Sequence, residues 1–337
     1  MTHYPISLKK YNTFGIDAYA KHLVEANTEE DIIAFFENKP KNKEFLILNG
    51  GSNILITKNI DAWILKINLK GIEIVEENDN EVVVRVLAGE NWHDFVLHSI
   101  ENNWGGLENL SLIPGNVGSC PIQNIGAYGV EVKDVITTVE SLNIYTLQKH
   151  IFTNEDCKFG YRDSIFKNEQ KGKFVLTAVS FRLKKAPHQL KTSYGVIESE
   201  LQKNNISQPT IKDISNAVIA IRNSKLPNPR EIGNGGSFFK NPVIGKERFE
   251  QFIAQNPEAP HYIVDKLHIK IPAGWLIEQA GMKGYRKGDA GVHTKQALVL
   301  VNYGNATGND ILEVAYEVQN RVFEKFQITI EPEVNII

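Results

Sequence analysis

The chain has 337 residues, of which 42% are hydrophobic and 23% charged. These values exclude disordered and fibrous proteins, and the length predicts two or three domains. Lysine and arginine total 37 against 40 acidic residues, a net charge of −3. A mildly acidic chain lacks the positive field that drives binding to phosphate backbones, so we expect no nucleic-acid partner.

No segment is typical of a secreted or membrane protein. The opening sequence, MTHYPISLKKYNTFG, lacks the apolar core of a signal peptide, and no apolar run approaches the roughly 20 residues that span a bilayer. The two cysteines, Cys120 and Cys157, are too few for a disulfide framework or a four-cysteine zinc site. We therefore expect a cytoplasmic protein with free thiols, no membrane partner and no metal.

The first half of the chain reads as short helices and strands. Thr28, followed by acidic residues and helically spaced apolar residues, predicts a helix over 28–38. The segment 45–56, FLILNGGSNILI, predicts two strands joined by a glycine-rich loop. Apolar patterns predict further strands and one helix, in the order strand 62–69, strand 81–89, helix 91–103, strand 136–147 and strand 173–185.

The second half opens with a polar stretch, which predicts a domain boundary between about 186 and 212. A glycine-rich loop is expected at 233–242 and a helix that stops at Gly281. The strongest pattern is an amphipathic helix over 309–326 whose apolar residues share one face. The remaining predictions are a helix at 212–224, a strand at 295–304 and a strand-like tail at 327–337.

Common nucleotide, metal and hydrolase motifs are absent. The sequence contains no P-loop, no Gly-x-Gly-x-x-Gly between a strand and a helix, no His-Glu-x-x-His and no Gly-x-Ser-x-Gly. The loops therefore hold the candidate sites. Gly50 to Asn53 is either a tight turn or a backbone cradle for an anion. The irregular stretch 104–131 is either a cofactor-binding loop or a self-packed Ω-loop.

Three polar side chains outside these loops are candidates for chemistry, each with a structural alternative. Arg162 suits a bidentate pair with a carboxylate or a structural salt bridge. Ser237 follows three glycines and precedes two phenylalanines, so it is either a proton donor or a turn residue. Glu331 and Glu333 share one face of an extended tail, where carboxylates are usually solvated.

Taken together, ordered segments over nearly the whole chain resemble the UDP-N-acetylenolpyruvoylglucosamine reductases, flavoenzymes of peptidoglycan precursor synthesis. Each segment alone is weak, but their order is specific, and KTSYGVI at 191–197 is similar to the extra loop of the type I members. The segments are YNTFGIDA (11–18), LNGGSNILI (48–56), AGENWHDFV (88–96), GLENLSLIPGNVGSCPIQNIGAYGVE (106–131), CKFGYRDSIFK (157–167), KLPNPREIGNGGSFFKNP (225–242), AGWLIEQ (273–279) and EPEV (331–334).

This resemblance implies an α+β fold: a two-part FAD-binding region of the vanillyl-alcohol-oxidase type and an α+β substrate-binding domain. The implied division is 1–68 and 69–211 for the two FAD-binding parts, 212–326 for the substrate-binding domain and 327–337 for a strand carrying the catalytic glutamate. It implies bound, non-covalent FAD, with NADPH and UDP-N-acetylglucosamine enolpyruvate as substrates, and we expect a monomer.

The resemblance also implies residue roles. Arg162, Ser237 and Glu333 match the catalytic arginine, serine and glutamate of the family. Positions matching its flavin-binding loops are Gly50, Gly51, Ser52, Asn53, Pro114, Gly115, Ser119, Gln123 and Gly126. Positions matching substrate or nucleotide contacts are Tyr194, Lys225, Asn241 and Gln296. Two positions depart from the common family pattern: Cys120 stands where serine is more frequent, and Asn335 where arginine is frequent.

These roles are chemically reasonable. Hydride passing from NADPH through the flavin to the vinyl carbon places negative charge on the neighbouring carbon and its carboxylate. The permanent, forked charge of Arg162 suits that carboxylate, Glu333 can assist, and Ser237 can deliver the proton. Two alternatives remain: an alcohol oxidase with the same flavin fold, and a flavin-free module that binds sugar nucleotides.

Overall fold

The computed structural model describes residues 6–193 and 195–337. Its contacts divide the chain into two compact units, both assembled from discontinuous segments. Of the described residues, the first unit contains those within 21–50 and 61–224, and the second contains 6–20, 51–60 and 225–337. The predicted division into four parts stays a prediction, because it assigns each part a ligand-binding role. The two compact units are defined only by contacts between residues.

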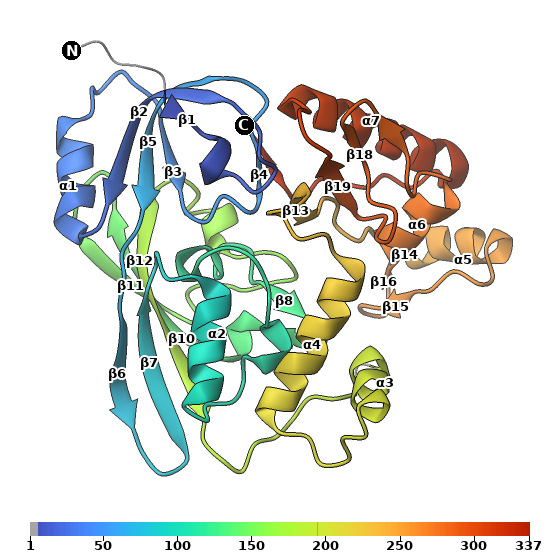
Figure 1. Ribbon diagram of the computed structural model, residues 1–337, viewed down its shortest axis with the longest axis horizontal. Coiled ribbons are helices and arrows are strands. Elements are labelled where there is room, and N and C mark those ends of the chain that lie inside the picture. Colours follow the sequence, from blue (N-terminus) through green and yellow to red (C-terminus); the bar gives the residue numbers. More distant parts are fainter. Residues whose placement is uncertain (1–5, 194) are drawn as a thin grey trace. The chain divides into compact units, whose positions relative to one another are not determined.

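A five-stranded antiparallel sheet forms the centre of the first unit, in the order β11-β10-β12-β7-β6 (Figure 1). Val139 pairs with Val179, and Val179 pairs in turn with Val86, so three of the predicted strands lie side by side. The strands are β6 (Ile72–Glu77), β7 (Glu81–Leu87), β10 (Ile136–Asn143), β11 (Lys149–Thr153) and β12 (Phe174–Lys184).

Helix α2 (Trp92–Glu101) covers one face of this sheet. Trp92 and Phe95 are fully buried and pack against Phe181 of β12, with ring centroids 6.0 and 5.0 Å away. The Asn91 side chain caps the helix by accepting hydrogen bonds from the amides of His93 and Asp94. The predicted helix at 91–103 is confirmed, and its buried face fixes the start of the glycine-rich stretch that follows.

The rest of the first unit consists of a small sheet layer, helix α1 (Glu29–Asn38), and two helices between residues 195 and 225. Helix α1 begins with a capping box at Thr28, as predicted, and packs its Phe35 beside Trp63. Helix α3 (Gly195–Lys203), which the sequence did not predict, packs with α4 (Ile211–Lys225). The other strands are β2 (Tyr19–Ala26), β3 (Phe45–Leu48), β5 (Ile60–Ile67), β8 (Gly126–Ala127) and β9 (Val130–Glu131).

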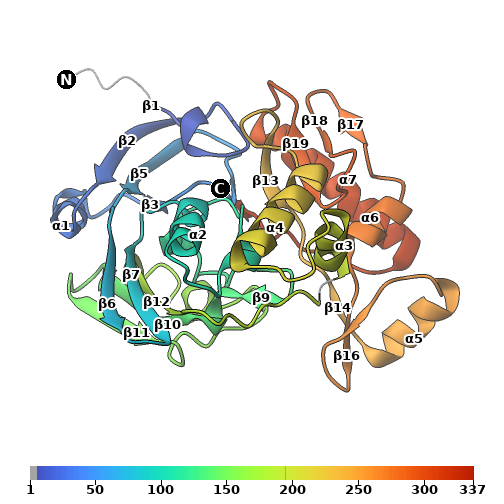
Figure 2. The same ribbon diagram turned by 60° about the horizontal axis from the view of Figure 1, so that its bottom comes forward.

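The second unit has α7 (Gly308–Phe326) against the sheet β13-β19-β18-β17 (Figure 2). Every apolar residue predicted for the inner face of α7 is buried, namely Ile311, Ala315, Val318, Val322 and Phe326. The sheet contains β13 (Gly233–Ser237), β17 (Arg286–Lys287), β18 (Ala290–Val292) and β19 (Val299–Asn302). The loop predicted at 233–242 was therefore wrong for its first five residues.

Small elements complete the second unit. Helix α6 (Ala273–Gln279) ends two residues before Gly281, the predicted stop, and α5 (Lys246–Gln255) was not predicted. Of the predicted tail strand, β20 (Asn335–Ile336) is formed, and it pairs in parallel with β4 (Ile54–Leu55). The other strands are β1 (Ile6–Ser7), β14 (Val243–Gly245), β15 (Tyr262–Ile263) and β16 (His268–Lys270).

Candidate functional site

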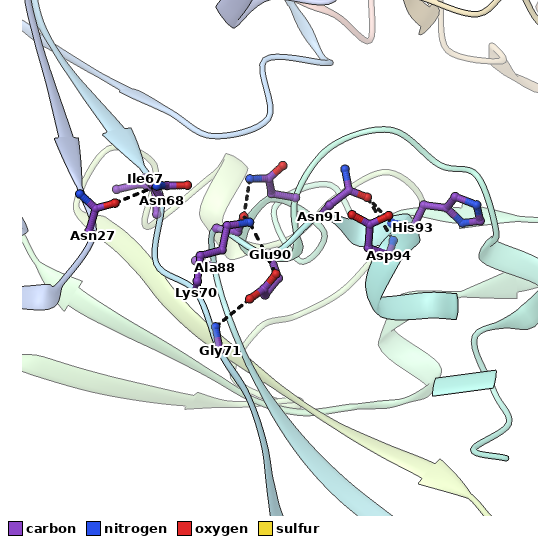
Figure 3. Close-up of polar contacts among 12 residues, drawn as sticks. Asn27, Ile67, Asn68, Lys70, Gly71, Ala88, Glu90, Asn91, His93 and Asp94 are labelled. Carbon is purple, nitrogen blue, oxygen red and sulfur yellow. Dashed lines mark hydrogen bonds and ion pairs between the residues drawn. The ribbon is translucent and has the colours of Figure 1, made fainter. Parts of the chain in front are cut away.

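A tight turn at residues 88–91, between β7 and α2, anchors the first candidate site (Figure 3). Glu90 accepts a hydrogen bond from the Gly71 amide at 2.7 Å, which fixes the turn against the start of β6. The loop at 114–119 is bonded to the same turn: the amide of Val117 donates to the carbonyl of Glu90, and that of Gly118 to the carbonyl of Ala88, both at 2.9 Å. The turn therefore holds the glycine-rich loop at a defined position.

Three backbone amides remain available where this loop meets residue 50. Within the described residues, the N–H groups of Gly50, Gly115 and Asn116 donate no hydrogen bond. A Cβ atom on Gly50 would lie 2.7 Å from the Gly115 Cα and 2.9 Å from the Asn116 Oδ1, so only glycine permits this approach. Neighbouring N–H groups without a protein acceptor can bind a phosphate or another polar cofactor group.

Residues 51–53, which follow Gly50, belong to the second unit, and contacts within that unit hold them in place. Gly51 has φ +63°, and a Cβ atom on it would lie 1.9 Å from the Tyr11 carbonyl oxygen. The amides of Gly51 and Ser52 also donate no hydrogen bond within the described residues. The Asn53 side chain donates to the Glu333 carbonyl at 3.4 Å. Within the second unit, Asn53 is thus bonded to the C-terminal tail.

Arg162 and Gly126 meet in the first unit. The Arg162 guanidinium donates from Nη2 to the Gly126 carbonyl at 2.8 Å, and its backbone is left-handed, with φ +53°. Asn124 is buried and supports both segments by donating to the Gly160 carbonyl at 2.8 Å. The Arg162 guanidinium is half-buried, and both readings of this residue stay predictions. Ser119 and Gln123 lie in the same loop and are half-buried, and Pro114 is exposed.

A second arginine, Arg222 of α4, lies beside this group. Its pKa is lowered by burial above all, and the positive charge of Arg162 lowers it further. A hydrogen bond with the Tyr128 side chain acts in the opposite direction. Burial lowers the pKa of His93 from 6.5, and the positive charge of Arg222 contributes. Arg222 is thus close enough to Arg162 and to His93 for their charges to interact, an arrangement that sequence reasoning missed.

The pattern of α4 held a signal for Arg222. The buried residues Ile211, Ile214, Ser215 and Val218 recur at helical spacing, and residue 222 continues the same stripe. An arginine in the core-facing stripe of a helix is unusual, because a buried charge requires a partner.

In the second unit, Ser237 ends strand β13, and Glu333 lies in the C-terminal tail, which bridges to Phe239 at Pro332. Ser237 is exposed at the end of β13, opposite Val299. The next residue, Phe238, donates to the Leu298 carbonyl and accepts from the Glu333 amide, both at 2.7 Å. Glu333 is half-buried, whereas Glu331 is exposed with its carboxylate 3.9 Å from Lys240. Asn335 donates twice to the Asn53 carbonyl, so the residue that departs from the family pattern supports the tail.

The predicted substrate contacts are only partly brought together. Asn241 accepts a hydrogen bond from the Ala273 amide at 2.9 Å, at the start of α6. The side-chain oxygen of Gln296 would lie 3.4 Å from a Cβ atom on Gly274, so both side chains border the first turn of α6. Lys225 is exposed at the end of α4. Tyr194 lies outside the described residues.

Comparisons with known proteins decide the family. A model described as the C-terminal domain of UDP-N-acetylenolpyruvoylglucosamine reductase matches residues 228–337, and an FAD binding domain model matches residues 20–148. A reductase of that name from Flavobacterium johnsoniae is 59% identical over 331 residues, 98% of each chain. The chain belongs to the UDP-N-acetylenolpyruvoylglucosamine reductase family. A second relative of that name, from Chromobacterium violaceum, is 46% identical over 97% of this chain and 96% of its own.

The fold agrees with membership of the reductase family. The crystal structure of UDP-N-acetylenolpyruvylglucosamine reductase from Thermus caldophilus superposes with a TM-score of 0.70 at 23% identity, covering 99% of this chain and 98% of that one. The predicted α+β class with an FAD-binding region is confirmed. The amides of Gly50, Gly115 and Asn116 fit the polar cofactor that an FAD-binding domain implies.

Within the described residues, no group of three or more histidine, cysteine or acidic residues is placed to hold a metal ion. No helix in the same ranges is long and apolar enough to cross a bilayer. Cys120 and Cys157 are buried free thiols.

Proposed function

We propose that this member of the family reduces the enolpyruvyl group of UDP-N-acetylglucosamine enolpyruvate with NADPH, yielding UDP-N-acetylmuramate, a peptidoglycan precursor. Near-complete coverage by relatives named for this activity carries the proposal. Bound FAD supplies the relay of hydride from NADPH to the vinyl carbon. The chain itself holds the cofactor, orients the substrate and handles charge and protons.

Each catalytic candidate has a defined role in this proposal. Arg162 binds the substrate carboxylate, where its fixed positive charge stabilises the negative charge that develops after hydride addition. Ser237 donates its hydroxyl proton to the carbon next to the carboxylate, which completes reduction of the double bond. Glu333 assists by hydrogen bonding. The half-buried Arg162 and the accessible Ser237 hydroxyl suit these roles.

The remaining committed residues have binding roles. FAD contacts the loops at Gly50, Gly51, Ser52 and Asn53 and at Pro114, Gly115, Ser119, Gln123 and Gly126, whose amides are partly unsatisfied. Tyr194, Lys225, Asn241 and Gln296 contact the sugar nucleotide or NADPH. We further propose that the protein acts as a monomer in the cytoplasm; its two buried free thiols fit a reducing compartment. Light scattering of the purified protein tests the monomer.

The test separates the two half-reactions. The purified protein should be yellow, and NADPH without oxygen should bleach the flavin absorbance. Adding UDP-N-acetylglucosamine enolpyruvate should restore the absorbance and form UDP-N-acetylmuramate in equal amount. Rapid reoxidation by oxygen but not by this substrate would indicate an alcohol oxidase. A colourless protein that binds the substrate without turnover would indicate a binding module.

A further inference from the structure

The carbonyl groups of residues 88–90, in the turn between β7 and α2, each accept a hydrogen bond from the loop at 114–119. A fourth bond runs the other way, because the Trp92 amide donates to the Gly115 carbonyl at 3.0 Å. The conformation of the loop is therefore set, residue by residue, by the conformation of the turn. The three donors, in the order of the carbonyls, are the Gly118 amide, the Asn116 side chain and the Val117 amide, each at 2.9 Å.

The turn is held in its own place by the segment that leads into β6 (Figure 3). Oε1 of Glu90 accepts a hydrogen bond from the Gly71 amide at 2.7 Å, and Oε2 lies 3.5 Å from the Lys70 ammonium. Lys70 also donates to the Gly89 carbonyl. A Cβ atom on Gly89 would lie 2.6 Å from the backbone of Leu69, so the turn is pressed closely against this segment.

Among these contacts, the bond between Glu90 and Gly71 is the one whose loss should move the turn most. The Glu90 side chain is only 22% exposed, and a hydrogen bond to an ionised acceptor is about twice as strong as a neutral one. Lys70 is 51% exposed, so its ion pair contributes little. A shifted turn would carry the loop with it. The N–H groups of Gly115 and Asn116, which donate no hydrogen bond among the described residues, would then lose their fixed directions.

The charge of Glu90 separates this geometric role from simple electrostatics. A carboxylate repels the diphosphate of FAD at any distance, so removal of its negative charge should by itself strengthen cofactor binding. If the removal of the side chain weakens cofactor binding instead, the cause is the lost geometry of the turn.

We propose that Glu90 is a positioning residue for FAD. By holding the turn, it arranges the amides of Gly115 and Asn116 for the cofactor diphosphate before the cofactor arrives. A site that is already ordered loses less binding free energy to the ordering of its loops, which raises its affinity. Glu90 acts through the turn and the loop, without contacting FAD itself. The inference rests on the proposed contact of FAD with this loop and is independent of the substrate that the flavin reduces.

The test measures FAD affinity in three variants of one side chain. The dissociation constant is obtained by fluorescence titration of the deflavinated full chain, and the urea midpoint of the same apoprotein is measured beside it. Glu90→Ala should weaken FAD binding about 10-fold, near the lower end for a hydrogen bond to a charged group. Glu90→Gln keeps an oxygen that can accept from the Gly71 amide and should stay within about threefold of the wild type. Glu90→Asp keeps the charge but is one methylene shorter, so it should resemble Glu90→Ala.

The matched control is Asp156→Ala, which removes a carboxylate that accepts from the Thr153 amide at 2.9 Å, at the end of β11. It should leave FAD affinity unchanged. A lower urea midpoint with unchanged FAD affinity in Glu90→Ala would overturn the inference in favour of a purely structural role. Equal FAD affinity of Glu90→Gln and Glu90→Asp would also overturn it, and this comparison decides the matter if the alanine variant does not fold. Failure of the proposed cofactor site is read separately, from wild-type protein that does not bind FAD.

Discussion

The approach of Gly50 to the 114–119 loop gives the sharpest test of the proposed cofactor cradle. In Gly50→Ala, the new methyl would lie 2.7 Å from a backbone carbon, well inside the ordinary 3.4–4 Å contact. The blocking atoms belong mainly to the backbone, so the loops themselves must separate. Overpacking of this kind costs about 1–3 kcal/mol. If the cost falls on the bound form, FAD affinity drops by roughly 5- to 150-fold, since about 1.4 kcal/mol is tenfold.

The assay is fluorescence titration of the deflavinated protein with FAD, together with the flavin content after purification. Gly245→Ala is the matched control, because a Cβ atom there meets nothing within 4 Å and the backbone has φ −67°. Gly245→Ala should bind FAD like the wild type. Equal FAD affinity in both variants would refute the reasoning that this close approach shapes the cradle.

Three further predictions concern single side chains. Ser237→Ala should fold normally and reduce its flavin with NADPH, while stopped-flow product formation slows about 10²- to 10⁴-fold; equal slowing of both half-reactions would remove the proton-donor role. Burial lowers the pKa of His93 and His293 from 6.5 in the folded protein. As the pH falls, these histidines are therefore protonated in the unfolded chain before they are protonated in the folded protein. The free energy of unfolding in urea should therefore fall below about pH 6.5, with a smaller fall in His93→Asn and His293→Asn; a parallel fall in these variants would contradict it. Burial raises the pKa of Cys157 to about 12 and that of Cys120 well above its usual value. Both thiols should thus resist a thiol reagent at pH 8 until denaturant exposes them, and rapid native labelling would disprove this.

Local patterns in the sequence were enough to predict many of the helices and strands. The apolar stripe of α7 and the capping box of α1 depend on residues within one or two turns, so periodicity predicts them directly. The sequence patterns at 136–147 and 173–185 likewise predict strands β10 and β12, although the residues from Val175 to Phe181 of β12 are all buried. The candidate site residues were predicted from sequence motifs that follow one another in a fixed order. The spacing of residues within each motif can be read from the sequence without knowledge of the packing around it.

Other features follow from contacts between distant residues. The glycine-rich segment 233–237 forms strand β13 because β19 supplies hydrogen-bond partners, which overrides its poor strand propensity. Strand β20 exists through pairing with β4, about 280 residues earlier in the chain. The proximity of Gly50 to Gly115 likewise needs the folded loops.

The sequence by itself therefore determined the local elements, the family and the candidate side chains, because these depend on residue type and short spacing. The tertiary structure alone decided which amides lack a partner, that Asn53 bonds the tail at Glu333, and that Arg222 lies near Arg162. Burial and charge environment are sums over neighbours from distant segments, so no local pattern contains them.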